Sequence, residues 1–126
     1  MLRNKIFIAQ FLLIAFIGVL HITALELYWY WVFPWFDILV HFLGGLWATL
    51  ISLWFFFESG YVKVKRRVRN ISLVAFFTIF FVAIGWEVFE FLAGVPIVGD
   101  FAVDTTIDLI IGTLGALMAW IYYTSN

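Results

Sequence analysis

Residues 35–57 read WFDILVHFLGGLWATLISLWFFF, an apolar run in which only Asp37 and His41 can carry a charge. About 20 helical residues cross the roughly 30 Å hydrocarbon core of a bilayer, so this run is long enough to span a membrane. Three further runs have the same character: residues 6–28, 71–93 and 104–123. Runs of this length exclude the short strands of a barrel, and helices satisfy every backbone polar group in lipid. The sequence therefore predicts an all-α fold, a four-transmembrane-helix bundle with short loops.

Composition supports this class. Hydrophobic residues make up 66% of the 126 residues and charged residues only 12%, which excludes a disordered chain and implies that apolar surface faces the lipid bilayer. The chain has no cysteine, so disulfides, thiolate metal sites and thiol nucleophiles are excluded. We see no internal repeat or linker and predict one transmembrane domain over residues 1–126. No nucleic acid partner is expected, and an oligomer is left open.

The basic residues predict the orientation. Arg3 and Lys5 precede the first span, and the other five Lys and Arg residues fall at positions 63–69, between the second and third spans. Cytoplasmic loops carry the excess of Lys and Arg, so both termini and this loop should be cytoplasmic. No small-residue cleavage site follows the first run, so we expect a retained span and not a signal peptide.

The acidic residues gather at the opposite end, with Glu58 as the exception. Three spans each bring a pair of ligand-type residues there, at helical spacing that puts both side chains on one face. The pairs are Asp37 with His41, Glu87 with Glu90, and Asp104 with Asp108. Small residues continue these faces and allow close helix approach, so a bulky residue at Gly45 or Gly112 should hold the helices apart.

This crowding of carboxylates predicts a bound cation or bound protons. A carboxylate at the centre of a membrane helix costs about 2.5–3.5 kcal/mol, and no Lys or Arg lies at that end to pair with it. Carboxylates with an imidazole suit a divalent ion such as Mg²⁺, Mn²⁺, Ca²⁺, Zn²⁺ or ferrous iron. We expect His41, Glu87 and Asp108 to converge on it. The candidate metal ligands are Asp37, His41, Glu87, Glu90, Asp104 and Asp108.

Single residues also have structural explanations. Asp104 can cap its helix, and Asp37 can interact with the helix dipole after Pro34. His21 is more typical of a hydrogen-bonded packing residue than of a ligand. At the level of function three classes stay open. They are a membrane enzyme acting on an envelope lipid or its head group, a protein that handles protons or cations without chemistry, and a structural or partner subunit whose polar cluster only fixes helix packing.

Three motifs occur in order on successive spans: D-x-x-x-H-F at Asp37, W-E-x-x-E at Trp86, and D-T-x-x-D at Asp104 with downstream glycines. This series resembles the YjdF-type group of bacterial inner-membrane proteins and, more distantly, the VanZ-like family. In VanZ-like proteins the second and third motifs more often end in Gln and Asn, whereas here they end in Glu90 and Asp108. The resemblance implies a multi-pass protein of the bacterial inner membrane and cell envelope, and it implies no particular reaction.

Overall fold

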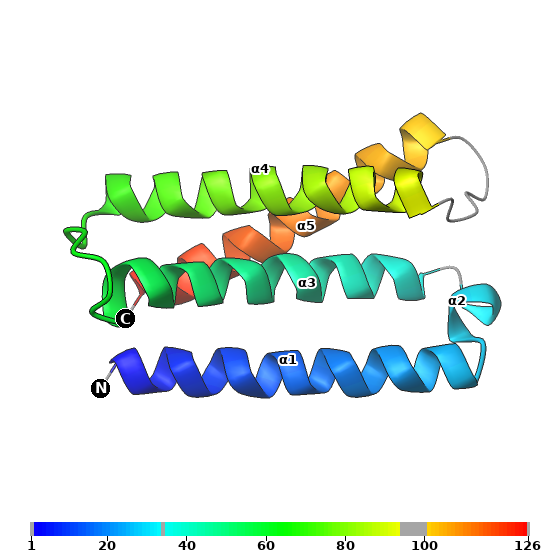
Figure 1. Cartoon of the computed structure of the whole chain (residues 1–126), viewed down its shortest axis with the longest axis horizontal. Coiled ribbons are helices and arrows are strands. Elements are labelled where there is room, and N and C mark those ends of the chain that lie inside the picture. The colour runs from blue at the N-terminus through cyan, green and yellow to red at the C-terminus, as the bar shows by residue number, and fades with distance from the viewer. Residues whose placement is uncertain (1, 34, 94–100, 126) are drawn as a thin grey trace.

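The computed structural model describes residues 2–33, 35–93 and 101–125, without the side chains of residues 2, 3, 90, 93, 101, 102 and 104. The described residues form helices and no strand, which confirms the predicted all-α class (Figure 1). The elements are α1 (Leu2–Glu26), α2 (Trp29–Val32), α3 (Phe36–Leu53), the π-helical turn η1 (Trp54–Glu58), α4 (Val68–Ala93) and α5 (Phe101–Thr124).

Among the residues that the structure describes, four helical segments are long and apolar enough to cross a membrane, as predicted. They are Asn4–Glu26, Phe36–Glu58, Val68–Phe89 and Thr105–Thr124. Their ends lie within a few residues of the expected ones, because each span is bounded by a turn or by a charged loop. The second span is continuous through α3 and η1, whose wider π turn was not foreseen from the sequence.

The short helix α2 is a second feature that the sequence did not predict. The predicted spans at 6–28 and 35–57 leave residues 29–34 as a short loop between them. Tyr28 instead takes a left-handed conformation, with φ of 60°, and reverses the chain after α1. The ring of Tyr30 then packs edge-on against Phe36 at a centroid distance of 5.0 Å. This turn therefore attaches the end of α1 to the start of α3.

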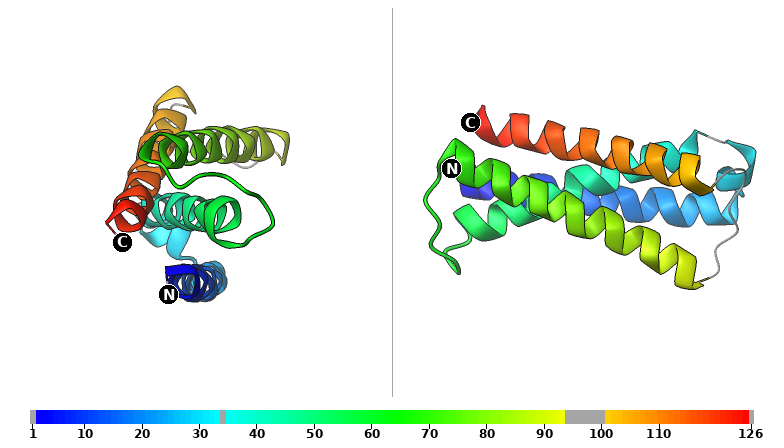
Figure 2. Two further views of the ribbon diagram at one scale, coloured as in Figure 1. Left: turned by 90° about the vertical axis from the view of Figure 1, so that its left-hand side faces the viewer. Right: turned by 90° about the horizontal axis from the view of Figure 1, so that it is seen from above.

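The central element of the bundle is α3. It lies between α1 on one side and α4 on the other, while α5 crosses it obliquely (Figures 1 and 2). The contact between α3 and α5 is the most extensive of any helix pair. Both described ends of the chain lie at the same end of the bundle as residues 59–67, which we call the basic end. The opposite end, with α2 and the start of α5, is called the acidic end.

Two glycines explain the close approach of α3 and α5. A Cβ atom on Gly45 would collide with the carbonyl oxygen of Gly112, and one on Gly115 would collide with that of Phe42. Backbone meets backbone at both positions, so neither can take a side chain without moving a helix. A Cβ on Gly112 would make only an ordinary contact, 3.5 Å from the side chain of Ile79. Gly45 and Gly115, more than Gly112, are thus the tight positions.

A packed cluster closes the basic end. Tyr123 is fully buried there among Ile6, Leu53 and Ile71. Its hydroxyl donates to a carboxylate oxygen of Glu58 over 2.7 Å. Arg66 donates from Nη2 to the Tyr123 carbonyl over 3.0 Å, and its guanidinium lies 4.5 Å from the centre of the tyrosine ring. These contacts hold the basic loop against the end of α5.

Candidate cation site at the acidic end

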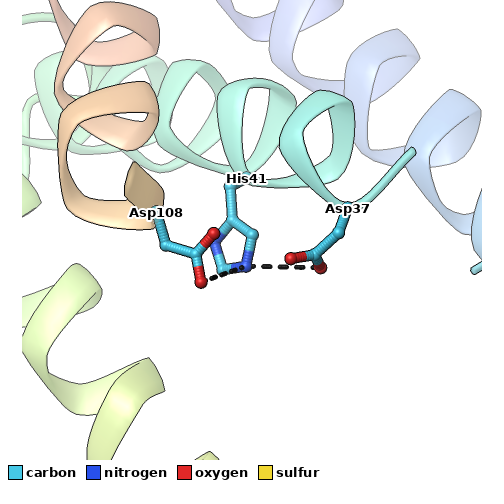
Figure 3. A group of neighbouring side chains, drawn as sticks. All are labelled: Asp37, His41 and Asp108. Atoms are coloured by element: carbon cyan, nitrogen blue, oxygen red, sulfur yellow. Dashed lines mark ion pairs between the residues drawn. The ribbon is translucent and has the colours of Figure 1, made fainter. Parts of the chain in front are cut away.

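Three predicted ligands meet where α3 passes α5. Asp37 lies in the first turn of α3, where the helix dipole favours an acid, and His41 lies one turn further on. Asp108 lies on α5, about two turns from its start. The close contact between Gly45 and Gly112 brings the two helices together one turn beyond His41 and Asp108. Figure 3 shows the imidazole between the two carboxylates.

The distances suit a shared ion. Nε2 of His41 lies 3.5 Å from Oδ1 of Asp37 and also 3.5 Å from Oδ2 of Asp108. One ligand atom from each of the three residues lies within 4.8 Å of the others. Good hydrogen bonds between nitrogen and oxygen are shorter, about 2.7–3.2 Å. Two ligand atoms of a tetrahedral ion with bonds of about 2.1 Å are roughly 3.4 Å apart, so each of the two 3.5 Å distances is compatible with a shared ion.

The three side chains of the cluster differ in how much of their surface is exposed. The side chain of Asp37 is 44% exposed, that of His41 14% and that of Asp108 3%. Asp108 is therefore the deepest member, within an apolar span, where an ionised carboxylate needs a positive partner. The sequence provides no Lys or Arg at this end. A protonated imidazole or a cation is left to balance the two carboxylates.

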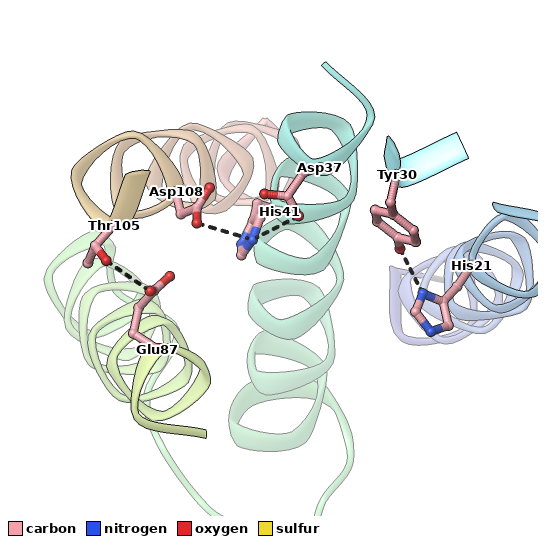
Figure 4. Close-up of polar contacts among 7 residues, drawn as sticks. All are labelled: His21, Tyr30, Asp37, His41, Glu87, Thr105 and Asp108. Carbon is pink, nitrogen blue, oxygen red and sulfur yellow. Dashed lines mark hydrogen bonds and ion pairs between the residues drawn. The ribbon is translucent and has the colours of Figure 1, made fainter. Parts of the chain in front are cut away.

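Glu87 faces the same region from α4 but makes a different contact. Its Oε2 accepts a hydrogen bond from the hydroxyl of Thr105, over 3.1 Å (Figure 4). Glu87 is buried, and it is not part of the group whose ligand atoms lie within 4.8 Å of one another. The neighbouring Trp86 packs its ring edge-on against His41, with centroids 6.4 Å apart. Helix α4 thus closes one side of the cluster.

His21 has a different partner. Its Nδ1 lies 2.7 Å from the hydroxyl of Tyr30, in a hydrogen bond that joins α1 to α2 (Figure 4). This contact agrees with the expectation of a hydrogen-bonded residue and not a ligand. Burial, with a smaller contribution from the Asp37 carboxylate, raises the pKa of Tyr30 above its ordinary value of 10.0. The phenol therefore stays protonated near neutral pH and can donate to the imidazole.

The structure brings three of the six predicted ligands together. Asp37, His41 and Asp108 come together, and Glu87 lies nearby on a separate hydrogen bond. Glu90 and Asp104 lie outside the residues whose side chains the structure describes. Thr105 was not among the candidates. Its three-residue spacing from Asp108 was the available signal, because that spacing puts both on one face of α5.

Fold and site together define a polytopic helical membrane protein with a polar cluster between its spans. The chain belongs to the family described as predicted membrane protein (DUF2238), whose model matches residues 3–125. No curated protein and no solved structure matches the chain.

Proposed function

We propose that this chain is a bacterial cell-envelope protein of the inner membrane that binds one divalent cation through Asp37, His41 and Asp108. The proposal extends to action on an envelope lipid or its head group. The observation that carries it is the position of Nε2 of His41, 3.5 Å from a carboxylate oxygen on each side. Two carboxylates and one imidazole are ligands that suit Mn²⁺, ferrous iron or Zn²⁺, and also the harder Mg²⁺ and Ca²⁺.

The orientation follows from charge. Every Lys and Arg residue belongs to the basic end of the bundle. The excess of these residues on cytoplasmic segments supports cytoplasmic N- and C-termini. The acidic end then faces the outer side of the inner membrane, where Asp37 is the most exposed ligand. A lipid head group in the outer leaflet would lie at the same level.

The chemistry available there is that of a Lewis acid. Asp37, His41 and Asp108 would hold the cation, which would supply polarisation of a phosphoryl or carbonyl oxygen or a lowered pKa for a bound water. Glu87 is the nearby acid that would be left to handle protons as a general base, with Thr105 orienting its carboxylate. Glu90 and Asp104 stay candidate further ligands on the strength of their helical spacing from Glu87 and Asp108.

A metal-content measurement tests the proposal. The purified protein in detergent is loaded with Mn²⁺ or Zn²⁺, desalted, and analysed for bound metal. We expect about one ion per chain, and loss of that ion in His41→Ala and Asp108→Asn. His21→Ala is the matched control, because His21 bonds to Tyr30 and lies outside the cluster. Metal binding that survives both cluster substitutions would refute the assignment.

The close packing of α3 and α5 favours a second candidate, a purely structural cluster. Gly45 and Gly115 hold the two backbones in contact beside the cluster, so its polar atoms could serve only to fix the register of the helices. The metal-content measurement, combined with thermal unfolding, distinguishes a structural cluster from a cation site. A structural cluster predicts no bound metal in the native protein and a lower Tm for Asp108→Asn. A cation site predicts a Tm that rises with added metal, because a ligand that binds only the folded state stabilises it.

A further inference from the structure

A groove between α4 and α5 lies beside the cation cluster. Its volume is about 380 Å³. The residues lining it are Ile84, Glu87, Val88 and Phe91 from α4 and Thr105 and Leu109 from α5. Four of the six are hydrophobic, and the two polar ones are the pair joined by the hydrogen bond between Glu87 and Thr105. The groove is therefore open and mostly apolar, with one hydrogen-bonded polar pair in its wall.

The surroundings of the groove indicate what fills it. The groove lies between two spans, and the side chains along its mouth face outward: Val88 is 50% exposed and Phe91 is 69% exposed. In a membrane such a surface faces hydrocarbon and not water. An acyl chain matches both the apolar walls and the medium at the mouth, whereas a polar ligand would leave its hydrogen bonds unsatisfied there.

The groove and the cation cluster share the first turns of α5. Thr105 and Leu109 line the groove, and Asp108 lies between them in the sequence and joins His41 in the cluster. We propose that the groove holds an acyl chain of a phospholipid and directs its phosphate to the cation held by Asp37, His41 and Asp108. This assignment of the substrate class rests on the proposed function.

Electrostatic repulsion makes phospholipid binding in the groove depend on the cation in the cluster. Without a cation, the carboxylates of Asp37, Glu87 and Asp108 repel a phosphate, and no Lys or Arg at this end offsets them. With a divalent cation bound, a phosphate oxygen can complete its coordination shell. Retention of a phospholipid should therefore need both an open groove and the metal.

Lipid retention on delipidated protein tests the inference. Dioleoyl phosphatidylglycerol is added in detergent with Mn²⁺, and bound lipid is counted by native mass spectrometry. We expect one retained lipid on the wild type and about tenfold weaker retention in Val88→Trp, since losing about two buried methylene contacts has that effect. Val82→Trp is the control, because Val82 is also exposed on α4, at 45%, and does not line the groove.

A second pair of substitutions, on α5, separates loss of the groove from a general folding defect. Leu109→Trp fills the groove from α5, and Ile110→Trp places the same side chain at an exposed neighbour outside it. Equal retention by the groove variants and their controls would overturn the groove assignment. Retention that persists in chelator would overturn the route from phosphate to cation.

Bound metal measured on the same samples separates this inference from the proposed function. Groove variants that keep the ion and lose the lipid support both. A wild type that holds no metal but retains the lipid in chelator defeats the cation function and the phosphate assignment, and leaves the acyl groove standing.

Discussion

Nε2 of His41 on α3 lies 3.5 Å from Oδ2 of Asp108 on α5, although the two residues are far apart in the sequence. The contact joins the most buried acid of the cluster to the imidazole that also faces Asp37. It depends on the approach of two helices at Gly45, so a change in helix packing should affect the site directly.

The first prediction concerns the tight glycines. Gly45→Ala and Gly115→Ala should each destabilise the protein by about 1–3 kcal/mol, because the new methyl group meets a backbone carbonyl that cannot rotate away. Gly44→Ala is the control, since nothing lies within 4 Å of a Cβ at that position. Thermal unfolding in detergent measures the difference. Equal Tm values for Gly44→Ala and Gly45→Ala would mean that the helices do not approach as described.

The second prediction concerns pH. A metal-ligating imidazole must be deprotonated, so protons compete with the cation for His41. We expect Mn²⁺ affinity to fall as the pH falls, by at most about tenfold per pH unit for one competing proton. Calorimetric titrations at pH 7.5, 6.5 and 5.5 measure this change. An affinity that stays constant between pH 7.5 and pH 5.5 would mean that His41 does not bind the cation.

A third prediction addresses the basic end. Tyr123→Phe removes the hydroxyl that donates to Glu58 and leaves the rest of the buried ring in place. A hydrogen bond to a charged group contributes about 1.5–3 kcal/mol, so unfolding should become easier by roughly that amount. Tyr61→Phe makes the same chemical change at an exposed ring and should have little effect. Chemical denaturation in detergent compares the two variants, and similar losses in both would argue against the Glu58 contact.

The fourth prediction concerns topology. Reporter fusions at the C-terminal Asn126 should be active in the cytoplasm, and a single cysteine placed at Tyr28 should be labelled from outside the cell. The reason is the position of all Lys and Arg residues at the basic end. Fluorescent fusions report a cytoplasmic C-terminus and alkaline phosphatase fusions report an external one. Thiol labelling of intact cells reports whether the cysteine at position 28 is outside. External activity at the C-terminus would reverse the bundle and put the acidic end in the cytoplasm.

The sequence by itself determined the number and type of the spans. Runs of about 20 apolar residues leave helix as the state that satisfies the backbone in lipid, and polar loops or turns bound them, so the four spans were predictable to within a few residues. The pairing of Asp37 with His41 on one face was also predictable, because it depends only on local helical spacing.

Only the tertiary structure decided which pairs meet. Helical spacing determines which face of its helix a residue lies on, but it does not determine which neighbouring helix packs against that face. The neighbour depends on backbone contacts such as that between Gly45 and Gly112. The crossing of α3 by α5 brings Asp108 to His41, while Glu87 on α4 bonds to Thr105. The turn at α2 likewise rests on the left-handed Tyr28, a conformation that nothing in the apolar pattern indicates. The site is thus a product of helix packing, which involves residues distant in sequence and so has no local signature.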